Sequence, residues 1–231
     1  IDKQGTKLYG DYLTAGSIVI DEKTTINGQV WPLNFSRTYS GTQTMRSAIV
    51  NSLNTCAVKI WLQVGKDYSV EMLKKFGITT LVEEGDANDL NASALALGGM
   101  TKGTTTLEMA SAFSTFPNNG VRYDTSSFTK VVDKQGNVIL ENKPKEHKVL
   151  DEGVAWIMAD MLSSVVNSAA ANYAQISGVF VGGKTGTTDD AFDDWFNGFT
   201  PTYSASLWIG SDYGISLSDH SIIATYMWGN I

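Results

Sequence analysis

The sequence predicts an α+β fold, because helical patterns fill most of its first part and strand patterns fill its last part. Apolar residues recur at helical spacing over much of 44–166, interrupted by one hairpin pattern, whereas β-branched and turn residues dominate from 177 to 210. Helices gathered ahead of a run of strands are typical of α+β domains rather than of alternating βαβ units. We therefore expect a mainly helical part over 1–170, and strands of a sheet with a C-terminal helix over 177–231.

The helices are predicted from apolar stripes that follow capping residues. Thr44 precedes "MRSAIVNSL", Asn54 or Thr55 caps "CAVKIWLQV", and Ser69 opens a helix that ends near Gly77. "TTTLEMASAFSTF" predicts a fourth helix. "DEGVAWIMADMLSSVV" is the clearest, since acidic first-turn residues precede one continuous apolar face.

The strands are predicted from β-branched runs bounded by turn residues. The first forty residues, rich in Gly and Thr, favour loops and short extended segments. Two β-branched runs around 134–137 predict a hairpin near 127–141. After Ser177, "VFVGGKTGTT", "DWFNGFT" and "SASLWIGSDY" predict three strands, and a last apolar helix is expected from about Asp219.

The composition argues against several classes of function. The 17 basic and 24 acidic residues give a net charge of −7 without any run of Lys or Arg, which disfavours a nucleic-acid partner. Cys56 is the single cysteine and there are two histidines, so we expect neither a disulfide nor a metal site, and no cofactor. No apolar run reaches the roughly 18–20 residues of a membrane span.

The stretch "GVFVGGKTGTTDD" over 178–190 satisfies two incompatible motifs. Gly178-x-x-x-x-Gly183-Lys184-Thr185 is the P-loop pattern of nucleotide-binding proteins. Lys184-Thr185-Gly186-Thr187 is the Lys-Thr-Gly signature of penicillin-recognising serine enzymes. The two readings predict opposite local structures, a phosphate-binding loop or a strand beside a peptide groove.

The neighbouring residues favour the strand. Residues 179–181 are Val, Phe and Val, which suit a pleated strand, and the residues after Lys184 include Gly186 and four aspartates, which oppose a helix and repel phosphate. Alternation places the two threonines of the motif on one face and its lysine and glycine on the other. A glycine there permits another backbone to approach, as an added peptide strand requires. An ordinary edge strand with a solvated lysine is the alternative.

A second motif, Ser52-Leu53-Asn54, lies at the junction of the first two helical patterns. A Ser and an Asn at i and i+2 across such a junction present a hydroxyl and an amide in one direction. Alone they are ordinary capping residues. Combined with the downstream Lys-Thr-Gly-Thr, the pair is specific.

On these motifs the sequence resembles the transpeptidase domain of class A penicillin-binding proteins, which cross-link peptidoglycan. The likeness covers "WPLNFSRTYSGTQTMRSAIVNSLNTCAVKIW", "ASALALGGMTKGTTTLEMASAFSTFPNNGVRY" and "GGKTGTTDDAFDDWFNGFTPTYSASLWIGSDY". It implies an antiparallel sheet flanked by helices plus a helical subdomain, the fold shared with serine β-lactamases. It further implies serine acyl transfer on the D-Ala–D-Ala end of a stem peptide, with β-lactams trapped at the acyl stage.

The resemblance also assigns roles. Ser52 would relay protons to the leaving amine, Asn54 would bind substrate and the catalytic Lys, and Lys184 would hold the Ser52 hydroxyl. Thr185 and Thr187 would bind the substrate carboxylate, and the Thr187 N–H would supply half of an oxyanion hole. No histidine is placed to activate a serine, so lysines would serve instead.

Four aromatic positions and an acidic cluster complete the candidates. Trp195, Trp208 and Trp228 are predicted core residues, with the alternative that Trp195 and Phe196 wall the groove beside Gly186. The four aspartates between 189 and 194 suggest a metal, but their irregular spacing favours a solvated turn.

The family's Ser-x-x-Lys nucleophile is the one missing element. The only such pattern is Ser127-Phe128-Thr129-Lys130, which lies in the predicted hairpin, where Ser and Lys point to opposite faces. We therefore expect the nucleophile upstream of Ile1, in the same or a separate chain, and this fragment alone to be inactive. The resemblance implies a protein at the outer face of the bacterial cytoplasmic membrane, anchored by an N-terminal segment. A non-catalytic relative that binds β-lactams or muropeptides is the alternative.

Overall fold

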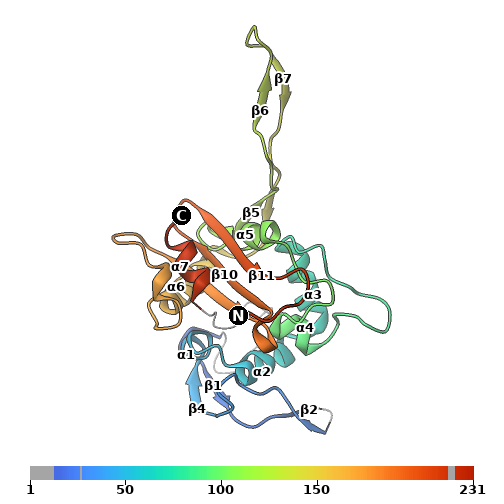
Figure 1. Ribbon diagram of the computed structural model, residues 1–231, viewed down its shortest axis with the longest axis vertical. Coiled ribbons are helices and arrows are strands. Elements are labelled where there is room, and N and C mark those ends of the chain that lie inside the picture. Colours follow the sequence, from blue (N-terminus) through green and yellow to red (C-terminus); the bar gives the residue numbers. More distant parts are fainter. Residues whose placement is uncertain (1–12, 27, 218–221) are drawn as a thin grey trace.

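A three-stranded antiparallel sheet organises the computed structural model, which describes residues 13–26, 28–217 and 222–231 (Figure 1). The strand order is β11–β10–β9, where β9 spans Gly182–Thr187, β10 Asp193–Phe199 and β11 Ser204–Gly210. Within the described residues β9 pairs with β10 alone. Its outer edge therefore presents backbone groups that a further strand can reach.

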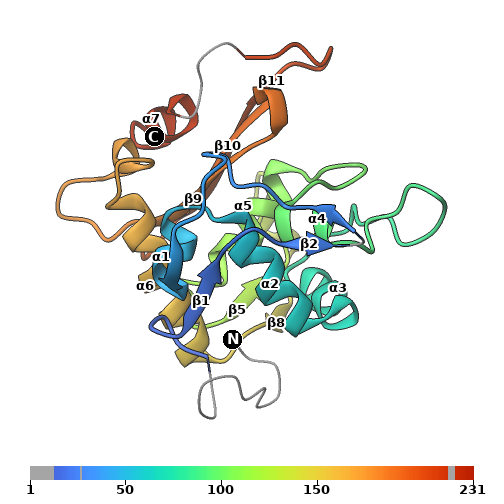
Figure 2. The same cartoon turned by 90° about the horizontal axis from the view of Figure 1, so that it is seen from below.

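Helices flank the sheet and form a second body beside it (Figure 1; Figure 2). Helices α5, α6 and α7 contact the sheet, α1 contacts α6, and α2 contacts α3 and α4. In chain order, α1 to α7 span Met45–Val50, Asn54–Val64, Lys66–Lys75, Ala92–Leu97, Thr106–Ser114, Glu152–Val166 and Ile223–Trp228. Single 3₁₀ turns occupy Asn172–Ala174 and Asp189–Ala191.

The remaining strands of the described residues form two-stranded antiparallel ladders. They pair β1 (Ile18–Asp21) with β4 (Gly41–Thr44), β2 (Thr25–Ile26) with β3 (Gln29–Val30), β5 (Val121–Tyr123) with β8 (Glu146–Lys148), and β6 (Lys130–Val132) with β7 (Val138–Glu141). In the β1–β4 ladder, β4 leads directly into α1.

The core lies on both faces of the central sheet. Phe196 and Phe199 in β10 are fully buried, and side chains an odd number of residues apart point to opposite faces of a strand. Phe196 packs edge-on against Trp228 of α7, with ring centroids 5.4 Å apart, while Phe199 packs against Phe116 at 6.0 Å. Burying each ring contributes roughly 1.5–3 kcal/mol. The sheet therefore packs against α7 on one face and against Phe116, which follows α5, on the other.

Glycines allow these rings to lie close to the strands. A Cβ on Gly183 would stand 2.4 Å from the Phe196 ring and 2.8 Å from the Asn197 carbonyl oxygen. A Cβ on Gly182 would stand 2.5 Å from the Phe199 ring. The glycine pair before Lys184 is thus required by packing, and it lets β9 lie flat against β10.

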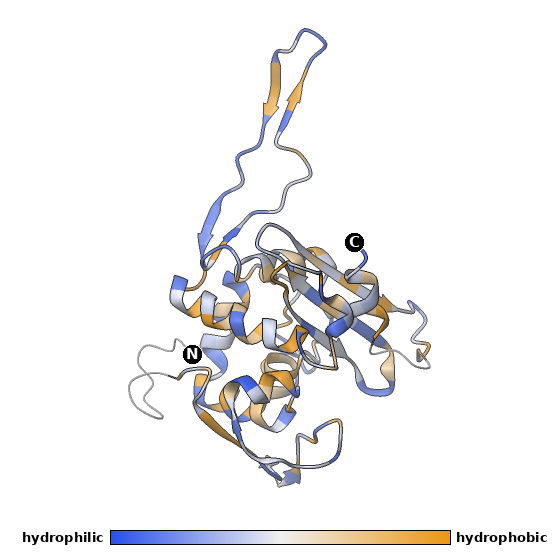
Figure 3. Ribbon diagram, turned by 90° about the vertical axis from the view of Figure 1, so that its left-hand side faces the viewer, coloured by the Kyte–Doolittle hydropathy of each residue, from blue (hydrophilic) through white to orange (hydrophobic). Residues whose placement is uncertain are grey.

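The predicted hairpin, formed by β6, β7 and the turn between them, is present and projects away from the rest of the molecule (Figure 1). Every residue of β6 and β7 is exposed. Apolar stretches run along both strands of this β6–β7 hairpin, as the orange segments in Figure 3 show, whereas its turn at 133–137 is polar.

The other predicted elements are present, with three corrections among the helices. The helix after Ser52 has Leu53 as its N-cap, so Asn54 and Thr55 lie inside the helix and do not cap it. The third helix begins at Lys66, because Gly65 before it has a non-helical backbone with a φ of 86°. Ser69 lies inside this helix, where its hydroxyl donates to the Gly65 carbonyl. Helix α4 was not predicted.

One predicted strand is shorter than expected. The strand with the Lys-Thr-Gly motif begins at Gly182, because Gly178 has a φ of 75° and opens a turn through 179. The last helix begins at Ile223; its predicted start near Asp219 lies outside the described residues.

Candidate active site

The structure brings the two sequence motifs together. Lys184 of β9 donates a hydrogen bond of 2.9 Å from its Nζ to the Oγ of Ser52, which lies in the turn between α1 and α2. The same ammonium also donates to the Thr185 carbonyl at 3.0 Å and lies 3.4 Å from the Thr185 hydroxyl. The site therefore joins the central sheet to the helical body.

The backbone of Ser52 is in the left-handed conformation. Its φ is 51°, its N–H donates to the Ile49 carbonyl, and the Leu53 N–H donates to the Ala48 carbonyl. These two bonds form a Schellman motif, in which glycine normally occupies the position of Ser52. A non-glycine residue there costs about 1–2 kcal/mol. A hydroxyl retained in a strained backbone beside a lysine supports a functional role for Ser52.

The first turn of α2 is held by a loop rather than by its own cap. Leu53 offers no side-chain hydrogen bond to the helix. Asn54 donates from Nδ2 to the Leu33 carbonyl at 2.9 Å, and the Thr55 N–H donates to Oδ1 of Asn34 at 3.3 Å. The Ser52–Asn54 junction is thus attached to the loop that follows β3.

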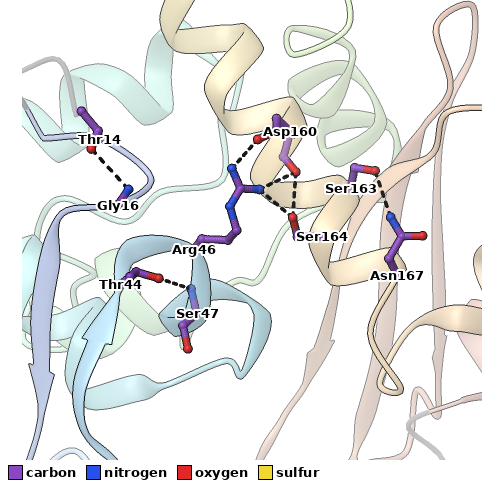
Figure 4. A network of polar contacts seen from close by, with 9 residues as sticks. All are labelled: Thr14, Gly16, Thr44, Arg46, Ser47, Asp160, Ser163, Ser164 and Asn167. Carbon is purple, nitrogen blue, oxygen red and sulfur yellow. Dashed lines mark hydrogen bonds and ion pairs between the residues drawn. The ribbon is translucent and has the colours of Figure 1, made fainter.

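Helix α1 is fixed to α6 by one arginine (Figure 4). Arg46 donates from Nη1 to the Asp160 carbonyl at 3.1 Å and to the Ser164 hydroxyl at 2.6 Å, and its Nη2 pairs with the Asp160 carboxylate. The N-terminus of α1 is capped by the Thr44 hydroxyl, which accepts from the Ser47 N–H. The N-terminal end of α1 is therefore anchored, and its C-terminal end leads through Asn51 to Ser52.

Lys184 carries an unneutralised charge. Burial lowers the pKa of its ammonium from 10.5 to about 8. Its acceptors are two hydroxyls and a carbonyl, all of them neutral, and none of the ion pairs formed by the described residues includes it. A carboxylate that enters the site would gain a hydrogen-bonded partner and would raise this pKa again.

The pairing of β9 with β10 sorts the motif residues by face. Lys184 lies opposite Asn197 and Gly186 lies opposite Trp195, so these residues share one face of the sheet. Thr185 lies opposite the buried Phe196. Gly186 leaves room beside Trp195, since a Cβ there would meet its nearest neighbour, the Cβ of Trp195, at 3.4 Å. Thr187 is exposed at the end of β9.

The aromatic predictions are corrected in part. Phe196 is a core residue and does not wall a groove. Trp228 is buried as predicted, but Trp208 is 38% exposed and donates from its indole N–H to Asp193. Trp195 is half-buried and lies beside Trp208, with ring centroids 6.4 Å apart.

The acidic cluster after the motif does not form one solvated turn. Asp194 is fully buried in β10, where its carboxylate accepts from the Ala224 N–H of α7 at 3.2 Å. Asp193 accepts from Trp208 and from the Thr188 hydroxyl. Within the described ranges, no three or more His, Cys, Asp or Glu side chains gather where they would hold a metal ion.

Two alternative motif readings fail on structure. Residues 182–187 form a strand and no helix opens at Lys184, so the P-loop reading is wrong. Ser127 lies before β6 and Lys130 begins it, so the one Ser-x-x-Lys pattern of the sequence is not helical.

Comparisons with known proteins agree with this arrangement. The family described as "Penicillin binding protein transpeptidase domain" matches residues 13–211. Penicillin-binding protein 1A of Clostridium botulinum (strain Langeland) is 38% identical over 202 residues, which cover 87% of this chain and 24% of that protein.

Solved structures show the same fold. PonA1 from Mycobacterium tuberculosis has a TM-score of 0.79 at 22% identity, covering 94% of this chain and 64% of its own, and it has also been solved in complex with penicillin V. The D,D-transpeptidase domain of a peptidoglycan glycosyltransferase from Eggerthella lenta has a TM-score of 0.75 at 20% identity, covering 94% of this chain and 58% of that one.

This chain belongs to the penicillin-binding protein transpeptidase domain family, which confirms the predicted resemblance and its α+β fold. It spans about 24% of the length of the first curated relatives it matches. Within the described ranges, no helix has both the length and the apolar character needed to cross a lipid bilayer.

Proposed function

We propose that the protein containing this chain is a serine-type D,D-transpeptidase that cross-links peptidoglycan and is acylated by β-lactams. The observation that carries the proposal is the hydrogen bond between Lys184 and Ser52 beside the unpaired edge of β9. An extended stem peptide fits such an edge as an added strand. The complex of the similar PonA1 protein with penicillin V supports the same class of ligand.

The proposed reaction is acyl transfer through the serine of an upstream Ser-x-x-Lys motif, since the one such pattern in this chain, at 127–130, does not lie on a helix. The upstream serine hydroxyl attacks the carbonyl of the penultimate D-Ala, and the C–N bond to the terminal D-Ala breaks. The leaving amine takes a proton relayed through the Ser52 hydroxyl. An amine of a second stem peptide then attacks the ester and releases the serine, which recovers its proton.

The residues of this chain supply charge and orientation in that scheme. Lys184, mostly protonated at neutral pH, would attract the terminal carboxylate of the donor peptide, and its hydrogen bond would orient the Ser52 hydroxyl. Thr185 and Thr187 would bind that carboxylate, and the Thr187 N–H would face the developing oxyanion. Asn54 would contact the peptide, and Gly186 and Trp195 would bound its backbone.

The nucleophile and the membrane anchor belong to the remainder of the protein in this proposal. The remainder is the N-terminal part of the same polypeptide or a separate chain, and it places the enzyme at the outer face of the bacterial cytoplasmic membrane. This chain alone is then inactive.

A fluorescent penicillin tests the proposal. The label is added to this chain, to the chain extended upstream through the first Ser-x-x-Lys motif, and to that extended chain carrying Lys184→Met. We expect stable labelling of the extended chain alone, slowed by Lys184→Met. Labelling of the unextended chain would show that the nucleophile lies within it. Absence of label from both would support a non-catalytic relative that binds its ligand without acylation.

A further inference from the structure

A buried carboxylate outside the proposed reaction connects β1 to the Ser52–Asn54 junction. Asp21, the last residue of β1, is 1% exposed. Its Oδ1 accepts from Asn34 Nδ2 at 2.7 Å and from the Thr55 hydroxyl at 2.5 Å. Its Oδ2 accepts from the Ser40 N–H at 2.7 Å and from the Ser40 hydroxyl at 2.6 Å.

The surroundings of Asp21 keep it ionised. Burial alone would raise the pKa of this carboxyl, but the hydrogen bonds from Ser40, Thr55 and Asn34 outweigh burial and hold the pKa below its usual value. All four donors are neutral, and no ion pair of the described residues includes Asp21. A buried carboxylate held only by neutral donors fixes the positions of those donors, because each lost bond leaves a polar group unsatisfied.

Two of the donors, the Asn34 amide and the Thr55 hydroxyl, belong to the contacts at the start of α2, whereas Ser40 precedes β4. Helix α2 has Leu53 as its N-cap and receives no side-chain cap from it. The Thr55 hydroxyl binds Asp21, and the Thr55 N–H binds Asn34, which in turn binds Asp21. A negative charge at a helix N-terminus is also favourable to the helix dipole. Asp21 and Asn34 together supply the cap that the local sequence lacks.

The same loop holds the second functional side chain of the junction. Asn34 follows Leu33, whose carbonyl accepts from the Asn54 amide at 2.9 Å. Displacement of Asn34 would therefore release Asn54 as well as Thr55. The contacts of Asp21 therefore reach the first turn of α2 and the loop that binds Asn54.

We propose that Asp21 is a positioning residue: through Asn34 and Thr55 its carboxylate fixes the first turn of α2, and thereby holds the Ser52 hydroxyl against Lys184 and the Asn54 amide in place. The consequence for acyl transfer rests on the function proposed above, but the placement of Ser52 does not. Asp21 touches no reacting group and acts through its neighbours.

Two matched pairs of variants test this proposal. The strong pair is Asp21→Ala and Asp89→Ala. Asp89 is equally buried, at 1% exposure, and accepts from the Val82 and Thr101 backbone and the Thr101 hydroxyl. The mild pair is Thr55→Val and Thr101→Val, each of which removes one hydroxyl donor to a buried aspartate and keeps the side-chain shape.

The first readout is the NMR titration of the Lys184 Cε signal, together with the side-chain amide signal of Asn54, in this chain. In Asp21→Ala the Lys184 midpoint is expected to rise from about 8 by at least one pH unit, because the junction moves and water reaches the ammonium. Thr55→Val moves it less in the same direction and shifts the Asn54 signal. Loss of the negative charge of Asp21 alone would lower the Lys184 midpoint. The direction of the change therefore distinguishes displacement of the junction from a purely electrostatic effect.

The controls decide the outcome. Asp89→Ala and Thr101→Val are expected to leave both signals unchanged while lowering thermal stability. A folded Asp21→Ala with an unchanged or lowered Lys184 midpoint would overturn the proposal, as would an equal rise in Asp89→Ala. If Asp21→Ala does not fold, an unchanged Lys184 midpoint and Asn54 signal in folded Thr55→Val would overturn it.

A second readout links the positioning to catalysis. In the upstream-extended chain, Asp21→Ala should slow penicillin acylation by at least tenfold relative to Asp89→Ala, with both compared at equal folded fraction. If the unsubstituted extended chain takes no label, the proposed function fails while the NMR titration still decides the role of Asp21. A rate in Asp21→Ala equal to that of Asp89→Ala would count against the positioning role.

Discussion

The ammonium of Lys184 and the hydroxyl of Ser52 are hydrogen-bonded at 2.9 Å across 132 positions of the sequence. One partner lies on a flat strand fixed by core aromatic rings, and the other lies in a strained turn between two helices. The strand and the turn are each held by contacts that do not involve the other. The length of this hydrogen bond therefore depends on how the central sheet packs against the helices. Substitutions in the strand or in the turn test that packing.

The pKa of Lys184 predicts a dependence of stability on pH. Because the folded chain binds this proton with a pKa of about 8 and the unfolded chain with 10.5, unfolding takes up a proton between these pH values. Stability contributed by this residue therefore rises with pH through that window, by on the order of 3 kcal/mol. Urea unfolding of the chain and of Lys184→Met at several pH values checks this. The gain in stability of Lys184→Met over the unsubstituted chain should be greatest at pH 7 and should disappear by pH 10.5. A difference independent of pH would contradict the lowered pKa.

The left-handed backbone at Ser52 predicts an unusual order of variants. Ser52→Gly and Ser52→Ala both remove the hydroxyl, but glycine adopts a φ of 51° without strain. Ser52→Gly should be more stable than Ser52→Ala by about 1 kcal/mol. Both should slow penicillin acylation in the upstream-extended chain by roughly 10²-fold or more, the usual contribution of proton transfer. Equal stabilities would argue against the strain, and a normal acylation rate would argue against the relay.

The two glycines that flank the motif lysine predict opposite effects. Gly183→Ala places a methyl group 2.8 Å from the Asn197 carbonyl oxygen, and should destabilise the fold by about 3 kcal/mol or more. Gly186→Ala meets its nearest neighbour at 3.4 Å and should change stability by less than about 1 kcal/mol. Its methyl group would stand on the Lys184 face, so acylation should still fall at least tenfold. Thermal unfolding and penicillin labelling separate the two variants, and a tolerated Gly183→Ala would contradict the packing.

Substitution of Arg46 is expected to cause a modest loss of stability, even when the replacement is lysine. Its pair with Asp160 is 35% and 41% exposed and contributes little, so the loss comes from its hydrogen bonds to the Asp160 carbonyl and the Ser164 hydroxyl. Arg46→Met and Arg46→Lys should each lower the free energy of unfolding by about 1–2 kcal/mol, because a single ammonium cannot reproduce the planar fork. Arg37→Met, which removes an exposed charge, serves as the control with a change below about 0.5 kcal/mol. A full recovery in Arg46→Lys would show that charge alone matters.

The sequence predicts this fold well where the signal is periodic and local. The apolar stripe of α6, the Thr44 cap of α1 and the β6–β7 hairpin are all present. The unpredicted α4 has the sequence "ASALAL", which is only six residues long and carries a single polar residue, Ser93, so it shows no amphipathic pattern. The cap of α2 was misassigned because its true partners, Asn34 and Asp21, lie 21 and 34 positions upstream of Thr55.

The site shows the same division. The motifs predicted which residues form the site, and the chemistry of the neighbouring residues favoured a strand over a phosphate-binding loop. Neither predicted which of these side chains would be buried. Asp194 belongs to a run that resembles a solvated turn, yet strand alternation carries it into the core. Phe196, two positions on, points the same way, while Trp195 between them remains half-buried. Side-chain direction is settled only once the register of β9 against β10 is known.

The β6–β7 hairpin offers experimental access to this protein. Every residue of its two strands is solvent-exposed. Its turn at 133–137 therefore does not contribute to the packing that holds Lys184 and Ser52 together. A dye or an affinity peptide inserted into that turn would label the protein without changing the packing around Lys184 and Ser52. The turn is thus an attachment point for probes that leaves the contact between Lys184 and Ser52 undisturbed.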